Sequence, residues 1–331
     1  MPKRSFVLIS LAFVCISGLA QGTPDGDFHL ALPAHQGQLQ LAAKGFKIIE
    51  SSAKPNGYEI GIRGKDDFGR LAFLAFLFLV PEQAPLTSAK CRDFVLAPQK
   101  KRNPTLKILG VQEVAQPGAP SVSVVSYTAK DRSGKSWYNV RAFVATADIC
   151  GDLEFYSDQP ISAGDTDLKM ILSTYRLDEK YVPTFNDIFV YAQILYNAHM
   201  YKPAAPMFEL ALEKLRKTPE SSNKTTMGRV ATDQAGMAYG ISGDIAKARA
   251  IFEKAITEDP DYPMYYYNLA CADAEEKNLV GAQKHLREAF ARKANVIPGE
   301  RLPDPTKDDS FVPYRNNKEF WSFLNSLQGK E

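Results

Sequence analysis

Alternation of apolar and polar residues dominates the first half of the chain and predicts β-strands. Residues 28–32, 58–62 and 121–127 alternate with the period of two that a strand shows when one face is buried. Residues 137–146 alternate in the same way after a turn-like stretch at 131–135, so they predict a hairpin with 121–127. Residues 71–80 are the most apolar segment after residue 20, and we expect a central strand covered on both faces, although periodicity alone does not separate this strand from a buried helix.

Two short helices are expected among these strands. Residues 88–96 begin with a serine cap and place Cys91 in the first turns. Residues 165–176 carry Leu168, Ile171, Leu172 and Tyr175 on one face. Strands without regular alternation of strand and helix indicate an α+β domain on an antiparallel sheet, here residues 21–181. This order resembles small exported α+β modules such as the PsbP-like group, and we carry no function over from that resemblance.

From residue 183 onward the strand pattern stops and helical periodicity takes over. One stripe runs along residues 244–256, and it ends at Asp259-Pro260. A set of positions recurs with a period of 34 residues. Its first copy is Gly236, Tyr239, Ala248, Phe252, Ala255 and Pro260, and its second is Ala270, Asp273, Ala282, Leu286, Ala289 and Ala294.

This period and this order of small, aromatic and bulky residues resemble the tetratricopeptide repeat (TPR). A looser copy lies upstream at Ala192, Leu195, Ala204, Phe208 and Ala211, separated by the loop-like residues 217–227. The resemblance implies an all-α solenoid of three helix pairs, at about 185–216, 229–262 and 263–296. A capping segment at 297–327 follows, because a solenoid end must be covered. Within it, residues 309–324 resemble the segment that ends many bacterial TPR proteins.

The resemblance also implies a partner-binding groove lined by the first helix of each pair. Its residues in this chain are Asn186, Phe189, Gln193, Tyr196, Asn197, Asp233, Met237, Ile241, Tyr267, Cys271 and Glu275. Phe189 and Gln193 stand where the TPR clamp for chaperone carboxylates needs Lys and Asn, which disfavours that partner. An aromatic, amide-rich lining favours a peptide or helix with apolar anchors. The alternative is that several of these aromatics pack against neighbouring helices or the first domain.

The first twenty residues resemble a secretory signal peptide. A basic start at Lys3 and Arg4, an apolar run at 6–16 and small residues before Gln21 predict cleavage after Ala20. We therefore expect an exported protein, periplasmic or extracellular, and the resemblance of residues 309–324 implies a bacterial host. In that oxidising setting Cys91 and Cys150, both in the first half, are predicted to pair, with a stabilisation of about 3 to 4 kcal/mol. Cys271 is left over.

Charge and motif content exclude several functions. Without Lys3 and Arg4, basic and acidic residues are equal in number, so a surface for nucleic acid or anionic membrane is not expected. The one basic run, at residues 100–102, is predicted to be a solvated loop. The four histidines lack metal-ligand spacing, and no cofactor or nucleophile motif occurs. A Cys271 and His285 dyad is disfavoured, since the repeat places the two on different surfaces.

The sequence thus predicts a non-enzymatic, exported binding protein or scaffold that holds a protein or peptide partner in its helical groove. One alternative is that the first domain is an enzyme or small-ligand receptor and the repeats only localise it. Another is a self-associating scaffold. We expect neither a cofactor nor a metal, and no membrane span after cleavage of the signal peptide.

Overall fold

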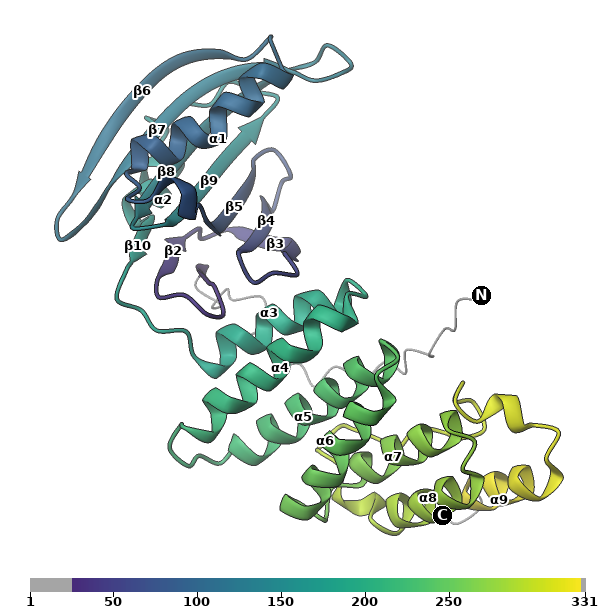
Figure 1. The fold of residues 1–331 in the computed structure, drawn as a ribbon. Helices are drawn as coiled ribbons and strands as arrows, with labels where there is room; N and C mark the ends of the chain where they lie inside the picture. Colours follow the sequence, from purple (N-terminus) through teal and green to yellow (C-terminus); the bar gives the residue numbers. More distant parts are fainter. Residues whose placement is uncertain (1–25, 329–331) are drawn as a thin grey trace. The chain divides into compact units, whose positions relative to one another are not determined.

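The computed structural model describes residues 26–328 and divides the chain into two compact units, whose boundary falls between Ala198 and His199 (Figure 1). The predicted domain boundary near residue 182 lies earlier in the chain. The predicted signal peptide lies outside the described residues. Within residues 26–328, no helix is both long enough and apolar enough to cross a membrane.

The first unit contains a seven-stranded sheet in which every neighbouring pair is antiparallel. Its spatial order is β3 (Phe46–Ala53), β4 (Glu59–Asp66), β5 (Ala72–Leu79), β9 (Ile149–Ser157), β8 (Ser136–Thr146), β7 (Ala119–Lys130) and β6 (Lys107–Gln116). The alternating segments 58–62, 121–127 and 137–146 fall in β4, β7 and β8, and the predicted hairpin is confirmed. The hydrophobic and polar pattern therefore identified these strands correctly.

A smaller sheet and two helices complete the layers of this unit. The small sheet consists of β1 (Asp27–Ala31), β2 (Gln38–Ala42) and β10 (Arg176–Asp178). It packs on one face of the large sheet, while helix α1 (Ser88–Arg102) packs on β7, β8 and β9 of the other face. Helix α2 (Thr166–Thr174) packs against β2 and confirms the helix expected at 165–176.

Cys91 of α1 and Cys150 of β9 form a disulfide, with their Cα atoms 5.9 Å apart. This confirms the predicted pairing. The bond lies in a core between α1 and the sheet that also contains Phe143, Val125 and Leu96. Cys271 is free.

Two details of the first unit differ from the sequence prediction. Strand β5 is covered fully on one face only: Phe73 and Leu77 are buried, whereas Phe76 is partly exposed. The reason is that α1 covers β7 to β9 and leaves the same face of β5 half open. The basic run 100–102 is not a loop but the last turn of α1, where positive side chains are favourable against the helix dipole.

Helix α3 (Phe185–Asn197) belongs to the first unit, although the repeat pattern had made it the first helix of the solenoid. It packs against β3 and β1, and the Tyr191 hydroxyl donates to the carbonyls of Lys54 (2.6 Å) and Glu59 (2.9 Å). A Thr184 and Asp187 capping box starts the helix. The apolar face of α3 therefore packs against strands of the first unit.

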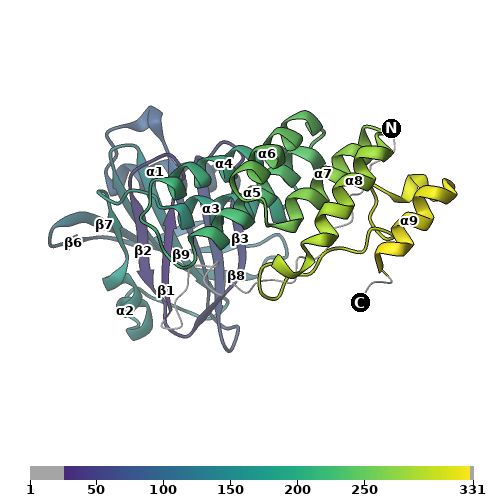
Figure 2. The ribbon, with the colours of Figure 1, turned by 90° about the horizontal axis from the view of Figure 1, so that it is seen from below.

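The second unit is helical. It contains α4 (Tyr201–Arg216), α5 (Lys224–Ile241), α6 (Ile245–Glu258), α7 (Pro263–Glu275), α8 (Leu279–Ala291) and α9 (Lys318–Gln328). Short turns join α5 to α6 and α7 to α8, so these helices form two TPR-like pairs. Figure 2 shows the second pair following the first. The small residue Gly236 allows α5 to approach α6 closely, because a Cβ at this position would lie 2.3 Å from the Phe252 ring. Helix α9 packs on α8 through Phe320 and Leu324.

Candidate partner-binding groove

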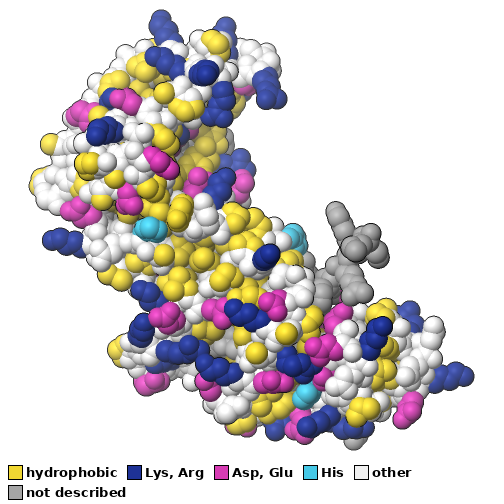
Figure 3. All heavy atoms as spheres, in the orientation of Figure 1, with side chains coloured by type: hydrophobic (Ala, Val, Ile, Leu, Met, Phe, Trp, Pro, Cys, Tyr) yellow, Lys and Arg dark blue, Asp and Glu magenta, His cyan; other side chains and the backbone are white. Residues whose placement is uncertain are grey.

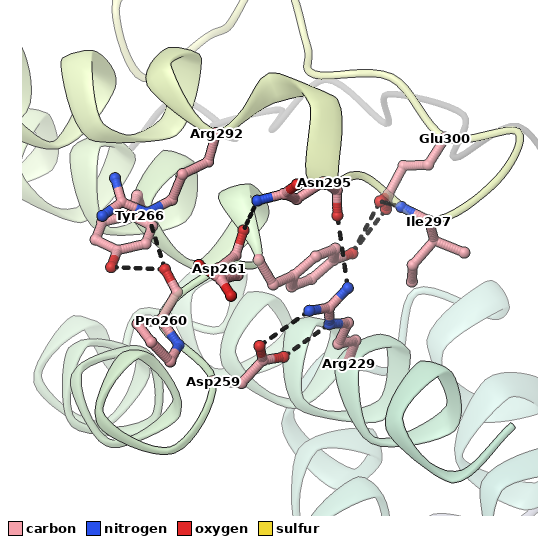
Figure 4. Close-up of polar contacts among 10 residues, drawn as sticks. Arg229, Asp259, Pro260, Asp261, Tyr266, Arg292, Asn295, Ile297 and Glu300 are labelled. Atoms are coloured by element: carbon pink, nitrogen blue, oxygen red, sulfur yellow. Dashed lines mark hydrogen bonds and ion pairs between the residues drawn. The ribbon is translucent and has the colours of Figure 1, made fainter. Parts of the chain in front are cut away.

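The turn between α6 and α7 is held by a network of charged and aromatic side chains (Figure 4). Arg229 of α5 donates from two nitrogens to the carboxylate of Asp259, at 2.7 and 2.9 Å. The carbonyl of Pro260 accepts from the Tyr266 hydroxyl at 3.0 Å and from Arg292 Nε at 2.9 Å. Such paired, charge-assisted bonds fix the turn, and with it the position of α7 relative to α5.

After α8 the chain turns back and lies against α5 and α7. We call residues 297–314 the return segment. Two of its carboxylates accept hydrogen bonds from α7 and the residue before it: Glu300 from the Tyr262 hydroxyl at 2.8 Å, and Asp308 from the Tyr267 hydroxyl at 3.1 Å. At its end the Tyr314 hydroxyl donates to the carbonyl of Ala274. The segment is therefore bonded along the whole length of α7.

Apolar anchors of the return segment lie between these polar contacts. Ile297 is buried in a cluster with Tyr262 and Leu269, against which Met237 of α5 also packs. Phe311 is fully buried, and its ring meets that of Tyr267 edge to face, with centroids 6.1 Å apart. Pro303 and Pro305 are also buried. Alternating apolar and acidic anchors make the segment resemble a bound peptide.

Two buried carboxyl groups meet where the segment crosses α5. Burial, together with the nearby charge of Glu300, raises the pKa of Asp233 from 3.8 to about 8. The side chain of Asp233 accepts a short hydrogen bond from the Asn268 amide of α7. Burial also raises the pKa of Glu300, despite its bonds from Tyr262 and from the Ile297 backbone. Protonation of Asp233 therefore reduces the cost of burying it near Glu300.

The predicted groove residues of α5 and α7 lie on the face that the return segment contacts. Asp233 and Tyr267 are buried in this contact, and Met237 is partly buried beside Ile297. Cys271 is partly exposed with its thiol 3.8 Å from Asp308 Oδ2. Ile241 and Glu275 are also partly exposed. The return segment of the chain itself therefore packs on part of the face that the repeat pattern predicts as the groove.

The predicted groove residues of α3 belong to the other unit. Phe189 is buried and stacks on Phe185 with ring centroids 5.3 Å apart, and Tyr196 is buried as well. Gln193 is partly buried, while Asn186 and Asn197 are exposed. The side chains of Phe189 and Tyr196 therefore pack inside the molecule, which agrees with the alternative that these aromatics pack against neighbouring elements.

Sequence reasoning missed the residues that fill this face, above all Glu300, Asp308 and Phe311. Residues 297–308 have the proline-rich, charged composition of a loop, and their acidic side chains gave no periodic signal. Only the fold shows that they approach Tyr262 and Tyr267.

The thiol of this site is not activated. Burial raises the pKa of the Cys271 thiol well above its ordinary value, and the neighbouring Asp308 adds to the effect. That is the opposite of an activated nucleophile, which needs a lowered thiol pKa. His285 bonds to Asp273 at 2.6 Å on the far side of the pair, where Arg249 also donates to Asp273. The hydroxyls and the ring that α7 and the residue before it present on this face all contact the return segment.

No protein-family model and no curated protein matches the sequence. Among solved structures, PcrH from Pseudomonas aeruginosa is similar over 44% of this chain and 92% of its own, with 12% identity and a TM-score of 0.30. The C-terminal TPR-containing domain of a Plasmodium falciparum FK506-binding protein covers 44% of this chain and 89% of its own, with 15% identity and a TM-score of 0.30. A multi-domain immunophilin from Arabidopsis thaliana covers 79% and 96%, with 10% identity and a TM-score of 0.26.

Proposed function

We propose that this chain is an exported, non-enzymatic protein-binding scaffold whose partner is a peptide segment held on the face formed by α5 and α7. The observation that carries the proposal is the return segment itself. A stretch of successive turns with apolar and acidic anchors lies on this face and uses the hydroxyls of Tyr262 and Tyr267. A surface that binds such a stretch within the chain has the donors and apolar contacts to bind one from another protein.

The return segment then competes with the partner peptide for the same face, because it belongs to the same chain and is always nearby. A tethered segment acts at an effective concentration of the order of millimolar, so a partner of micromolar affinity must displace it or be present in excess. Displacement is favoured by the cost of burying carboxyl groups in the contact, since both Glu300 and Asp308 have raised pKa values because of burial. We therefore expect exchange between a closed form, with the segment bound, and an open form.

A test uses the peptide of residues 297–311 in trans. The double variant Glu300→Ala, Asp308→Ala removes the polar anchors of the tethered segment while the helix pairs remain. A fluorescein-labelled copy of the peptide should bind this variant with a dissociation constant in the micromolar range and bind the unchanged chain at least tenfold more weakly. Hydrogen exchange over residues 297–314 establishes that the tethered segment is released.

The contrary result is a released segment with no peptide binding, which would mean that the face is only an internal packing surface. A charge-matched control is Glu253→Ala, Glu258→Ala on α6, because both side chains are exposed and neither contacts the segment. Alanine replacement of Phe189, Tyr196 and Tyr267 is a poor probe: all three are buried, and truncating each costs about 3 to 5 kcal/mol of folding free energy. Capture from the host's envelope with the released variant then identifies the partner.

A further inference from the structure

The edge strand β6 carries an unusual concentration of exposed apolar side chains. Eleven large apolar side chains are exposed among residues 26–328, and four of them belong to this one strand: Ile108, Leu109, Val111 and Val114. In the part of the chain that the structure describes, β6 is the last strand of the large sheet and pairs only with β7 (Figure 1). Its outer edge carries unpaired backbone donors and acceptors, which is the arrangement that accepts an added strand.

The pairable part of β6 is short and bounded. Residues 110–114 keep an unbroken register with β7, from Gly110 opposite Ser126 to Val114 opposite Val122. Irregularities between Ile108 and Gly110, and between Val114 and Gln116, bend the strand at both ends. These bends limit edge-to-edge aggregation over the full strand but leave about five residues straight enough to pair.

A cluster of positive charge lies at the start of β6. It combines the end of α1, the first residue of β6 and the β7–β8 hairpin. Its members are Lys100, Lys101, Arg102, Lys107, Lys130, Arg132 and Lys135, all of them exposed. The loop after α1 joins them, because Asn103 donates to the carbonyl of Lys130 (3.0 Å) and the Lys130 amide donates to Thr105 (2.9 Å). Figure 3 shows Lys and Arg gathering at this end of the sheet unit.

Few acidic groups offset this charge. Lys135 pairs with Asp158 at 2.8 Å. The Asp131 carboxylate accepts hydrogen bonds from Ser133 and from Trp137 Nε1, and these bonds lower its pKa to about 2. The remaining members of the cluster, on α1, β6 and the β7–β8 hairpin, are exposed to solvent. An anionic group arriving at this end of the strand therefore meets a positive field.

We propose that β6 binds an extended strand of another protein, antiparallel to residues 110–114, whose C-terminal end is acidic and lies beside the positive cluster. Antiparallel pairing is the more stable arrangement and brings the C-terminal end of the added strand next to Lys107. Backbone hydrogen bonds supply the affinity, and the apolar side chains and the charge select the sequence.

The same features argue against two other occupants. A membrane surface could receive Leu109 and Val111 but would leave the backbone edge without partners, which is costly in an apolar medium. In a second copy paired antiparallel, the end of β6 at Gln116 would face Lys107, and this offers no acid to the cluster. A strand with an acidic end would pair with the backbone groups of the β6 edge and would also place negative charge beside the positive cluster.

The test uses two nine-residue peptides that alternate threonine and valine over the first six residues, labelled with fluorescein at the N-terminus. One ends in three glutamates and the other in three lysines. Fluorescence anisotropy on the full mature chain should give a micromolar dissociation constant for the acidic peptide and at least tenfold weaker binding of the basic one. Raising the salt concentration should reduce the difference.

Two variants locate the site. Val111→Lys places a charge in the middle of the pairable stretch and should weaken binding of the acidic peptide at least tenfold. Lys101→Glu, Lys107→Glu, Arg132→Glu should reverse the preference between the peptides. The matched control is Val280→Lys, whose valine is 81% exposed in the helical unit. All altered side chains are exposed, and thermal melting checks that each variant is folded.

Three results would overturn the proposal. The first is no binding of the acidic peptide at millimolar concentration, and the second is equal binding by the chain with Val111→Lys. The third is a dimer in sedimentation velocity, or co-sedimentation with anionic vesicles, that Val111→Lys abolishes while neither peptide binds. Because Glu300→Ala, Asp308→Ala should leave this peptide binding unchanged, failure here is distinguishable from failure of the proposed groove.

Discussion

The hydroxyl of Tyr262 donates to the carboxylate of Glu300 at 2.8 Å, and this bond joins the start of α7 to a residue that follows the last repeat. The contact buries Glu300 close enough to Asp233 for their charges to interact. A polar pair inside a solenoid is costly unless it is neutralised or bonded. The return segment therefore couples the protonation of two acids to the packing of the helical unit.

The helical unit should lose stability as the pH rises from about 4 to about 8. The pKa of Asp233 is raised from 3.8 to about 8, so within this range the folded state binds a proton that the unfolded state has lost. The contribution is complete below the unfolded pKa and disappears through the folded one, with a slope of up to about 1.4 kcal/mol per pH unit. The measurement is urea unfolding at several pH values in a Trp137→Phe background, which leaves Trp321 as the probe.

Asp233→Asn is the control for this pH dependence. Asparagine keeps the size and the acceptor for Asn268 but does not titrate, so the difference in unfolding free energy between the two chains should grow steadily with pH. A parallel dependence in both chains would show that other groups are responsible.

Gly236→Ala should destabilise the helical unit by about 1 to 3 kcal/mol, because the added Cβ would lie 2.3 Å from the Phe252 ring and force α5 and α6 apart. Gly240→Ala, in the same helix, is the matched comparison. Its Cβ would lie 3.7 Å from that of Ala248, so it should be neutral or stabilising by up to about 1 kcal/mol. Equal effects of the two changes on urea unfolding would contradict the close approach at Gly236.

Loss of the Cys91–Cys150 bond should lower the melting temperature of the sheet unit, corresponding to about 3 to 4 kcal/mol from the loop that it closes. Cys91→Ala, Cys150→Ala is preferable to serine, since both positions are fully buried and a hydroxyl would add its own cost. Calorimetry with and without reductant makes the comparison. Reductant should affect the unchanged chain and the Cys271→Ala control but not the double variant.

Arg141 and Asp152 form a buried ion pair on β8 and β9, with Nε to Oδ1 at 2.7 Å and Nη2 to Oδ2 at 2.6 Å. Asp152→Ala should cost about 3 to 5 kcal/mol, because Arg141 stays buried with its bidentate partner gone and only Glu154, at 3.3 Å, left to balance its charge. The triple change Arg141→Met, Asp152→Leu, Glu154→Gln removes all three charges, keeps an acceptor for the Tyr127 hydroxyl, and should recover much of this loss in denaturant unfolding. A triple variant no more stable than Asp152→Ala would mean that the ion pairs themselves, and not the unbalanced charge, supply the stability.

The sequence by itself determined the local elements. Period-two alternation located β4, β7 and β8, and the 34-residue recurrence located the helices of the second and third pairs, because side-chain periodicity reports which face of an element is buried. It also paired Cys91 with Cys150, since Cys271 lies in the helical region. These are properties of short segments, and each segment carries its own signal.

The tertiary structure alone decided what covers each face. The pattern of α3 is that of a repeat helix, yet its Tyr191 bonds to Lys54 and Glu59 of the sheet unit. The groove positions Asp233 and Tyr267 followed from the repeat, but their neighbours Glu300 and Asp308 come from a loop-like stretch whose path depends on long-range contacts. An apolar stripe predicts that a surface will be buried. Which segment covers that surface depends on the packing of parts that are distant in the sequence.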